Sequence, residues 1–90
     1  MAIADERRAE VDLRAEDLDV LERLITAPSP GRFYPAVREG AVVEPGEKIG
    51  EVIRSGETTM VVSPFHGSLM GLLVLPGERV RLGQAVAWLS

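Results

Sequence analysis

The chain has 90 residues, a formal net charge of −4 at pH 7 and no cysteine. This length fits one small domain, and without cysteines neither a disulfide nor a thiolate-bound metal can stabilise it, so we expect a reducing, cytoplasmic environment. The negative charge argues against nucleic acid as a partner, and no apolar run is long enough to cross a membrane.

The N-terminal segment differs in composition from the rest of the chain. Residues 1–23 hold eight acidic and four basic side chains, whereas residues 24–90 hold six of each. No glycine or proline occurs between Asp5 and Leu24, and apolar residues recur there at helical spacing. The sequence therefore predicts an acidic helical extension over residues 1–24, although residues 21–26 also suit a strand. The apolar stripe of this helix would consist of Val11, Ala15, Leu18, Leu21 and Ile25.

Two roles fit such a helix. It could cover one face of the remaining domain, or it could use its apolar stripe to dock on a larger partner. The sequence leaves both roles open.

The second region, residues 25–90, contains one half-motif written twice. Its anchor residues recur 36 or 37 positions apart, so one residue was gained between the anchors. A repeat this short cannot bury an apolar face alone, and two interlocked copies related by a pseudo-twofold axis solve that problem. The paired anchors are Pro28/Pro64, Gly31/Gly67, Gly40/Gly77, Val43/Val80 and Gly46/Gly83.

Short β-type stretches separated by glycine and proline make up this region. They cover residues 32–37, 51–53, 58–62, 68–75 and 85–89. Regular short strands with such turns indicate an all-β sandwich or barrel.

The repeat also predicts the environment of individual residues. Gly40 and Gly77 should adopt positive φ, and Val43 and Val80 should point into a shared core. One of the neighbours Phe33 and Tyr34 should be buried and the other exposed, because successive strand residues face opposite sides. Trp88, in the last strand, is expected to pack in the core or at one end of the barrel.

The doubled pattern of Ala-Pro or Ser-Pro, then Gly, then Gly-x-x-Val-x-x-Gly resembles the biotinyl/lipoyl carrier domain. The stretch from Ile25 to Tyr34 is most similar to the biotin carboxyl carrier protein of acetyl-CoA carboxylase. The resemblance implies a flattened β-barrel of two interlocked four-stranded sheets over residues 25–90, with the helical extension before it.

The resemblance also reveals a departure from the family pattern. In a working carrier, the hairpin between the halves presents a lysine, typically as Ala-Met-Lys-Met, and its amine carries biotin or lipoate. The corresponding stretch here runs from Arg54 to Met60 and is about one residue shorter, so either Gly56 or Glu57 replaces the lysine. The only lysine of the chain is Lys48. We therefore expect no attached cofactor and a degenerate attachment hairpin at Ser55, Gly56 and Glu57.

Other residues give little indication of chemistry. His66 is the only histidine, so we interpret it as solvated surface, and neither a metal site nor a catalytic triad can be assembled. Ser55 lacks the helix-start context of a phosphopantetheine carrier. We expect no catalytic residues, no metal and no enzymatic activity.

Three functional readings remain. The favoured one is a non-biotinylated carrier homologue that serves as a binding or regulatory subunit of an acyl-CoA carboxylase or a related multienzyme complex. The second is an accessory or scaffolding module for a biosynthetic enzyme unrelated to biotin, and the least favoured is an active carrier or small enzyme. Whether the chain is a monomer or a homo-oligomer stays open. The predicted partner-binding residues are Arg54, Glu57 and Met60 on the hairpin and Val11, Leu18 and Leu21 on the helix.

Overall fold

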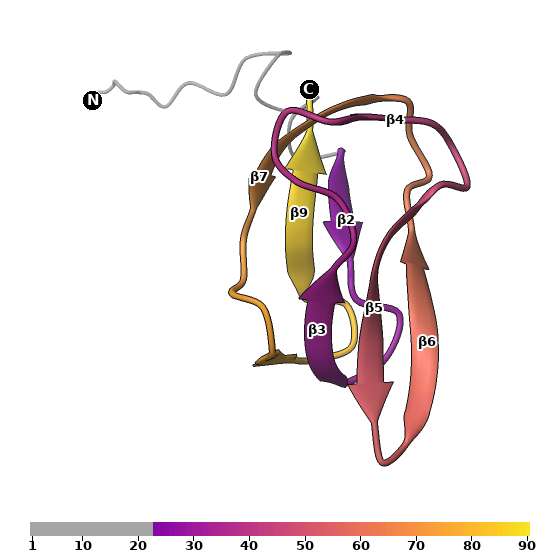
Figure 1. Cartoon of the computed structure of the whole chain (residues 1–90), viewed down its shortest axis with the longest axis vertical. Coiled ribbons are helices and arrows are strands. Elements are labelled where there is room, and N and C mark those ends of the chain that lie inside the picture. Colours follow the sequence, from indigo (N-terminus) through magenta and orange to yellow (C-terminus); the bar gives the residue numbers. More distant parts are fainter. Residues whose placement is uncertain (1–22) are drawn as a thin grey trace.

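The computed structural model describes residues 23–90, which form two four-stranded antiparallel sheets (Figure 1). No helix occurs among these described residues. The predicted all-β barrel-like sandwich is confirmed. In chain order the strands are β2 (Leu24–Thr26), β3 (Gly31–Pro35), β4 (Val42–Val43), β5 (Lys48–Arg54), β6 (Glu57–Val62), β7 (Gly67–Leu72), β8 (Glu78–Val80) and β9 (Ala85–Leu89).

The two sheets are equivalent under the sequence repeat. One has the strand order β2-β9-β7-β4 and the other β6-β5-β3-β8. Strands β2 to β5 belong to the first copy and β6 to β9 to the second. The counterparts are β2 and β6, β3 and β7, β4 and β8, and β5 and β9. When each strand of the first sheet is replaced by its counterpart, the strand order of the second sheet results. Each sheet therefore takes two strands from each copy, which confirms the predicted interlocking.

Backbone hydrogen bonds between the copies repeat in the same way. Ala27 donates from its N–H to the carbonyl of Gln84 at 2.8 Å, and the equivalent residue Ser63 donates to Glu47 at 2.9 Å. These bonds join the beginning of each copy to the last turn of the other copy.

The repeated glycines at the start of β3 and β7 are required by the close approach of a neighbouring strand. A Cβ on Gly31 would lie 2.6 Å from the carbonyl oxygen of Ile53, and one on Gly67 would lie 2.8 Å from that of Ser90. Ile53 and Ser90 are themselves equivalent positions of the repeat. Side chains at either glycine would push two strands apart.

The core follows the repeat at most of its positions. Val43 and Val80 are 0% and 4% exposed, as predicted, and Gly40 and Gly77 have φ of 94° and 80°. Ten of the buried apolar residues form five pairs one repeat apart, whereas Ala27 corresponds to the buried Ser63, Ala87 to Gly50 and Val74 to the partly buried Val37. The core consists of Ile25, Ala27, Phe33, Val43, Ile49, Val52, Val61, Leu69, Val74, Val80, Val86, Ala87 and Leu89.

Phe33 and Tyr34 divide as predicted. Phe33 is fully buried, whereas Tyr34 is 40% exposed on the outer face of its sheet.

Trp88 was expected in the core or at one end of the barrel, and the structure excludes the core. Val86 is skipped in the pairing of β2 with β9, where Ile25 faces Ala87 and Thr26 faces Ala85. This bulge lets the successive residues Val86 and Ala87 both point inward. It thereby interrupts the usual alternation of inward and outward side chains along β9. Trp88 is consequently half-buried on the outer face, with its indole against Gly71.

The boundary with the N-terminal segment is set by β2. This strand begins at Leu24, and Ile25 is buried in the barrel, so Ile25 is not available to the predicted helical stripe. The predicted helix before it lies outside the described residues. Within residues 23–90, no helix is long and apolar enough to span a membrane.

Candidate functional site

The β5–β6 hairpin is the candidate site, because it joins the two copies and extends beyond the other strands (Figure 1). Its tip is a two-residue turn of Ser55 and Gly56, with φ of 49° and 82°. Positive φ at both positions defines the turn type whose twist matches a two-stranded hairpin. Arg54 and Glu57 face each other at the base of the turn, and all four residues are exposed.

The tip offers no group for covalent attachment of a cofactor through an amide. Ser55 supplies a hydroxyl and Glu57 a carboxylate, and neither can be acylated to an amide. No group of histidine, cysteine, aspartate and glutamate residues that could hold a metal ion occurs within residues 23–90.

Lys48 lies at the opposite end of the same strand from the tip. It opens β5, six residues before Arg54, which places it about 20 Å away at the usual rise of a strand. Its Nζ is 3.2 Å from Glu51 Oε1. The single lysine of the chain therefore cannot substitute for one at the tip.

The predicted hairpin residues occupy two separate places. Arg54, Ser55, Gly56 and Glu57 form the tip together. Met60 lies farther along β6, opposite Glu51, and is 55% exposed on the outer face of the sheet. Met60 is thus part of a different surface. The remaining predicted contacts Val11, Leu18 and Leu21 lie outside the described residues.

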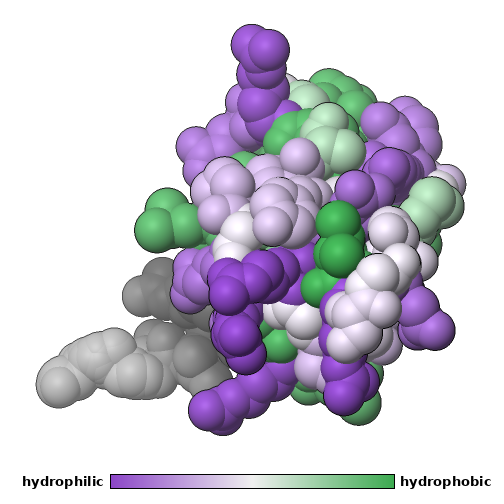
Figure 2. Space-filling view, turned by 60° about the horizontal axis from the view of Figure 1, so that its bottom comes forward, coloured by the Kyte–Doolittle hydropathy of each residue, from purple (hydrophilic) through white to green (hydrophobic). Residues whose placement is uncertain are grey.

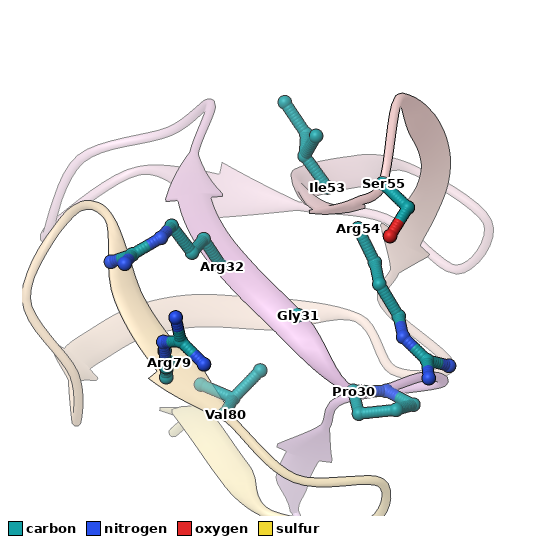
Figure 3. Close-up of a pocket in the computed structure, with 8 residues that line it drawn as sticks. All are labelled: Pro30, Gly31, Arg32, Ile53, Arg54, Ser55, Arg79 and Val80. Carbon is teal, nitrogen blue, oxygen red and sulfur yellow. The ribbon is translucent and has the colours of Figure 1, made fainter.

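Three arginines lie beside the tip; Arg54 was predicted from the sequence, whereas Arg32 and Arg79 were not. They line a depression of about 500 Å³ next to the hairpin. Figure 3 shows Arg32 and Arg79 on one side of Gly31 and Arg54 on the other. The sequence did contain a signal for Arg32 and Arg79, since each is the direct neighbour of an anchor residue of the repeat, Gly31 and Val80 respectively. The depression is lined by Pro30, Gly31, Arg32, Ile53, Arg54, Ser55, Arg79 and Val80.

Hydrophilic residues cover much of the face that carries the tip, with separate apolar residues between them (Figure 2). One of the apolar residues at this end is Leu82, which is 69% exposed and lies in a second depression that shares Arg79 and Val80 with the first. The depression beside the tip is thus lined by arginines and lies next to the exposed Glu57 and isolated apolar residues, which suits recognition of a charged ligand or partner.

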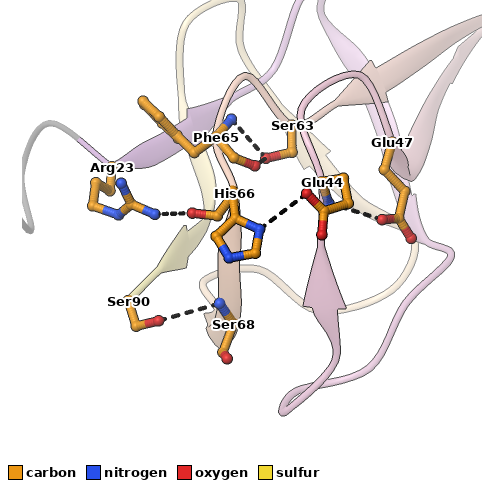
Figure 4. A network of polar contacts seen from close by, with 8 residues as sticks. All are labelled: Arg23, Glu44, Glu47, Ser63, Phe65, His66, Ser68 and Ser90. Atoms are coloured by element: carbon orange, nitrogen blue, oxygen red, sulfur yellow. Dashed lines mark hydrogen bonds and ion pairs between the residues drawn. The ribbon is translucent and has the colours of Figure 1, made fainter.

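A polar network occupies the opposite end of the barrel (Figure 4). His66 Nδ1 lies 3.0 Å from Glu44 Oε1, and both side chains are exposed. Arg23 donates to the backbone carbonyl of His66 and stacks 5.2 Å from the centre of the Phe65 ring. These contacts tie the turns at this end together and leave His66 solvated.

Solved structures with the same fold include parts of two carboxylases. The urea carboxylase of Kluyveromyces lactis has 25% sequence identity and a TM-score of 0.69, over 74% of this chain and 6% of that one. A single-chain, multi-domain long-chain acyl-CoA carboxylase has 18% identity and a TM-score of 0.66, over 88% of this chain and 8% of that one. The described residues are thus similar to a domain of carboxylases.

The same fold also occurs outside the carboxylases. A succinylglutamate desuccinylase/aspartoacylase from Rhodobacter sphaeroides has 26% identity and a TM-score of 0.64, over 76% of this chain and 21% of that one. The chain therefore spans a small part of each of these proteins. No protein-family model and no curated protein sequence matches it.

Proposed function

We propose that the protein is a non-biotinylated homologue of the biotin carboxyl carrier protein. It acts in the cytoplasm as a binding or regulatory subunit of an acyl-CoA carboxylase or a related multienzyme complex, without enzymatic activity of its own. The observation that carries this proposal is a carrier-like hairpin whose tip has lost its lysine while both copies of the barrel are intact.

The hairpin geometry favours one of the two alignments left open by the sequence. The four residues from Arg54 to Glu57 form a two-residue turn with one flanking residue on each side. Set against Ala-Met-Lys-Met, they place Gly56 at the position of the lysine. The alternative places Glu57 there, although Glu57 already belongs to β6. Gly56 is the better counterpart of the missing lysine.

Intact mass of the purified protein tests the absence of modification. Co-expression with a biotin ligase or a lipoate ligase should leave the mass of the wild-type chain unchanged. An added biotinyl or lipoyl group would contradict the proposal, and Lys48→Arg would then show whether that lysine carries it.

A gain-of-function variant separates the loss of the lysine from loss of the hairpin shape. Gly56→Lys should acquire some biotin or lipoate if the turn still has carrier geometry, and more than Glu57→Lys. The new lysine would adopt positive φ, at a cost of about 1 kcal/mol that the barrel can tolerate. If neither variant is modified, the shorter hairpin misplaces the amine, and the proposal then rests on the barrel alone.

The partner surface is tested by affinity capture with full-length and truncated chains. We expect the full chain to retain carboxylase subunits and the chain lacking residues 1–19 to lose them while remaining folded, because an apolar stripe buries more area than a short polar turn. Replacing Arg54 and Glu57 by alanine should weaken the capture less. Unfolding of the truncated chain would instead identify the segment as a structural cap.

The alternative function is an accessory module of an enzyme unrelated to biotin. The similarity to a desuccinylase/aspartoacylase at 26% identity supports it, because the fold occurs there as part of a different enzyme class. Specific recovery of such an enzyme in the same capture experiment, without carboxylase subunits, would favour this alternative.

A further inference from the structure

The depression beside the hairpin tip concentrates positive charge without an acidic side chain among its lining residues. Arg32, Arg54 and Arg79 line it together with small and apolar residues (Figure 3). Among residues 23–90 the contacts between basic side chains and carboxylates are Lys48–Glu51 and His66–Glu44, so none of these three arginines is paired with a described carboxylate.

Arg32 and Arg79 are held next to each other by the sheet. They are direct partners in the pairing of β3 with β8, where side chains on one face are about 5 Å apart at Cβ. Arg32 is oriented further by a hydrogen bond from Nη1 to the carbonyl of Gly77 at 2.9 Å. Like charges at directly opposed positions destabilise a sheet unless an anion lies between them. This arrangement indicates a site preformed for negative charge.

The repeat shows that the fold does not require arginines at positions 32 and 79. The equivalent depression, at the other end of the barrel, is lined by Arg23 and Phe65 together with the counterpart residues His66, Gly67, Ser68, Ser90 and Val42. Ser68 occupies the position of Arg32 and Val42 that of Arg79, and these two residues pair in the same manner across β4 and β7. The same backbone thus accepts a neutral pair. The arginine pair is an added property of the tip end.

We propose that this depression is a binding site for a phosphate-bearing small molecule, with pyrophosphate as the minimal ligand. One phosphoryl group would lie between the guanidinium groups of Arg32 and Arg79, which offer several N–H donors in planar forks. The adjoining phosphoryl group would reach Arg54 and the Ser55 hydroxyl on the other side of Gly31. The site does not depend on the proposed carboxylase partner.

The number and placement of the charges favour linked phosphates over a single carboxylate. A carboxylate carries one charge and cannot offset two opposed guanidinium groups with a third nearby. A phosphate group carries close to two charges and three acceptor oxygens. A volume of about 500 Å³ also lies in the range of small-molecule sites.

The test is a titration of the full chain with sodium pyrophosphate, followed by backbone amide NMR shifts at constant ionic strength. We expect saturable binding of one ligand, with shifts concentrated at Gly31, Ser55 and Val80. The variants Arg32→Ser and Arg79→Val install the residues found at the equivalent positions of the other sheet, Ser68 and Val42, so the backbone is known to accept them. Each should weaken binding about tenfold or more, since a charge-assisted pair is lost.

Arg38→Gln serves as the matched control, because Arg38 is an arginine of the barrel that does not line the depression. An equal loss of affinity in Arg38→Gln would identify non-specific charge attraction and overturn the proposal. Absence of saturable binding of pyrophosphate would also overturn it. Stronger binding of a tetraglutamate peptide than of pyrophosphate at the same residues would reject the phosphate assignment and identify an acidic protein segment as the ligand.

Discussion

The two copies of the repeat agree at the positions that face inward and differ at those that face outward. Inside, Phe33 corresponds to Leu69 and Val43 to Val80, and all are buried. Outside, Met60, Glu51 and Tyr34 form one row of a sheet, and their counterparts in the repeat are Leu24, Trp88 and Met70. These counterparts do not form one row, because a bulge pairs Trp88 with Gly71 instead of Met70. The comparison shows that burial constrains one face of each strand to apolar residues. The other face remains available for recognition, and the copies have diverged there.

The largest expected effect on the free energy of unfolding comes from truncating the bulkiest pair of equivalent core residues. Phe33→Ala should lower the free energy of unfolding by roughly 3–5 kcal/mol and Leu69→Ala by roughly 2–5 kcal/mol, because both side chains are fully buried. Such losses approach the whole stability expected of a domain this small, of the order of 5 kcal/mol. Urea denaturation followed by tryptophan fluorescence measures them. A neutral result at either position would show that the copies are not equivalent in the core.

A smaller and more symmetrical effect is expected at the paired valines. Val43→Ala and Val80→Ala should each cost about 1–3 kcal/mol, since both valines are almost completely buried. The same denaturation experiment applies. A difference of more than about 2 kcal/mol between them would break the equivalence of β4 and β8.

The paired turn glycines sharpen the comparison at the level of the backbone. Gly40→Ala and Gly77→Ala should each cost about 1–2 kcal/mol, because both residues adopt positive φ. A Cβ on Gly40 meets no atom within 4 Å, and one on Gly77 makes only ordinary contact with the Tyr34 ring at 3.6 Å. Backbone strain alone therefore sets both values. Unequal midpoints of thermal unfolding would implicate the Tyr34 contact.

The smallest effect is expected on the outer face. Combining Arg32→Ser with Arg79→Val replaces the opposed arginines by the pair found at the equivalent positions of the other sheet, and stability should change by less than about 1 kcal/mol. Any change should be towards greater stability at low salt, because the two guanidinium groups repel each other. Pronounced destabilisation would show that the arginines support the fold. It would contradict the conclusion that only the inward faces of the strands are constrained by stability.

The core and the topology could be predicted from the sequence because the repeat supplies internal evidence. Residues that recur with fixed spacing, such as Gly31 and Gly67, had to serve the same purpose in both copies. Trp88 could not be placed from the sequence, because a bulge at Val86 changes which side chains of β9 face inward. This bulge arises from the pairing of β9 with β2, which the sequence of β9 alone does not reveal. The short strands β4 and β8 carry too few residues for a periodic signal.

The candidate site was only partly predictable for a related reason. The tip from Arg54 to Glu57 follows from its position between the two copies. The arginine pair depends on register, because Arg32 and Arg79 are far apart in the chain and meet only when β3 and β8 align residue by residue. Met60 was assigned to the tip because it is near in sequence, although it lies on the outer face of the sheet, where Glu51 separates it from Tyr34.

Because each sheet takes two strands from each copy, one copy alone contains no complete sheet. An ancestral chain with a single copy would have had to associate with a second molecule, and the present chain has the topology of that domain-swapped dimer fused at Ser55 and Gly56. A chain cleaved at this exposed turn would yield two fragments, residues 1–55 and 56–90, that share every sheet. Neither fragment could fold by itself, but together they should reassemble as a non-covalent heterodimer.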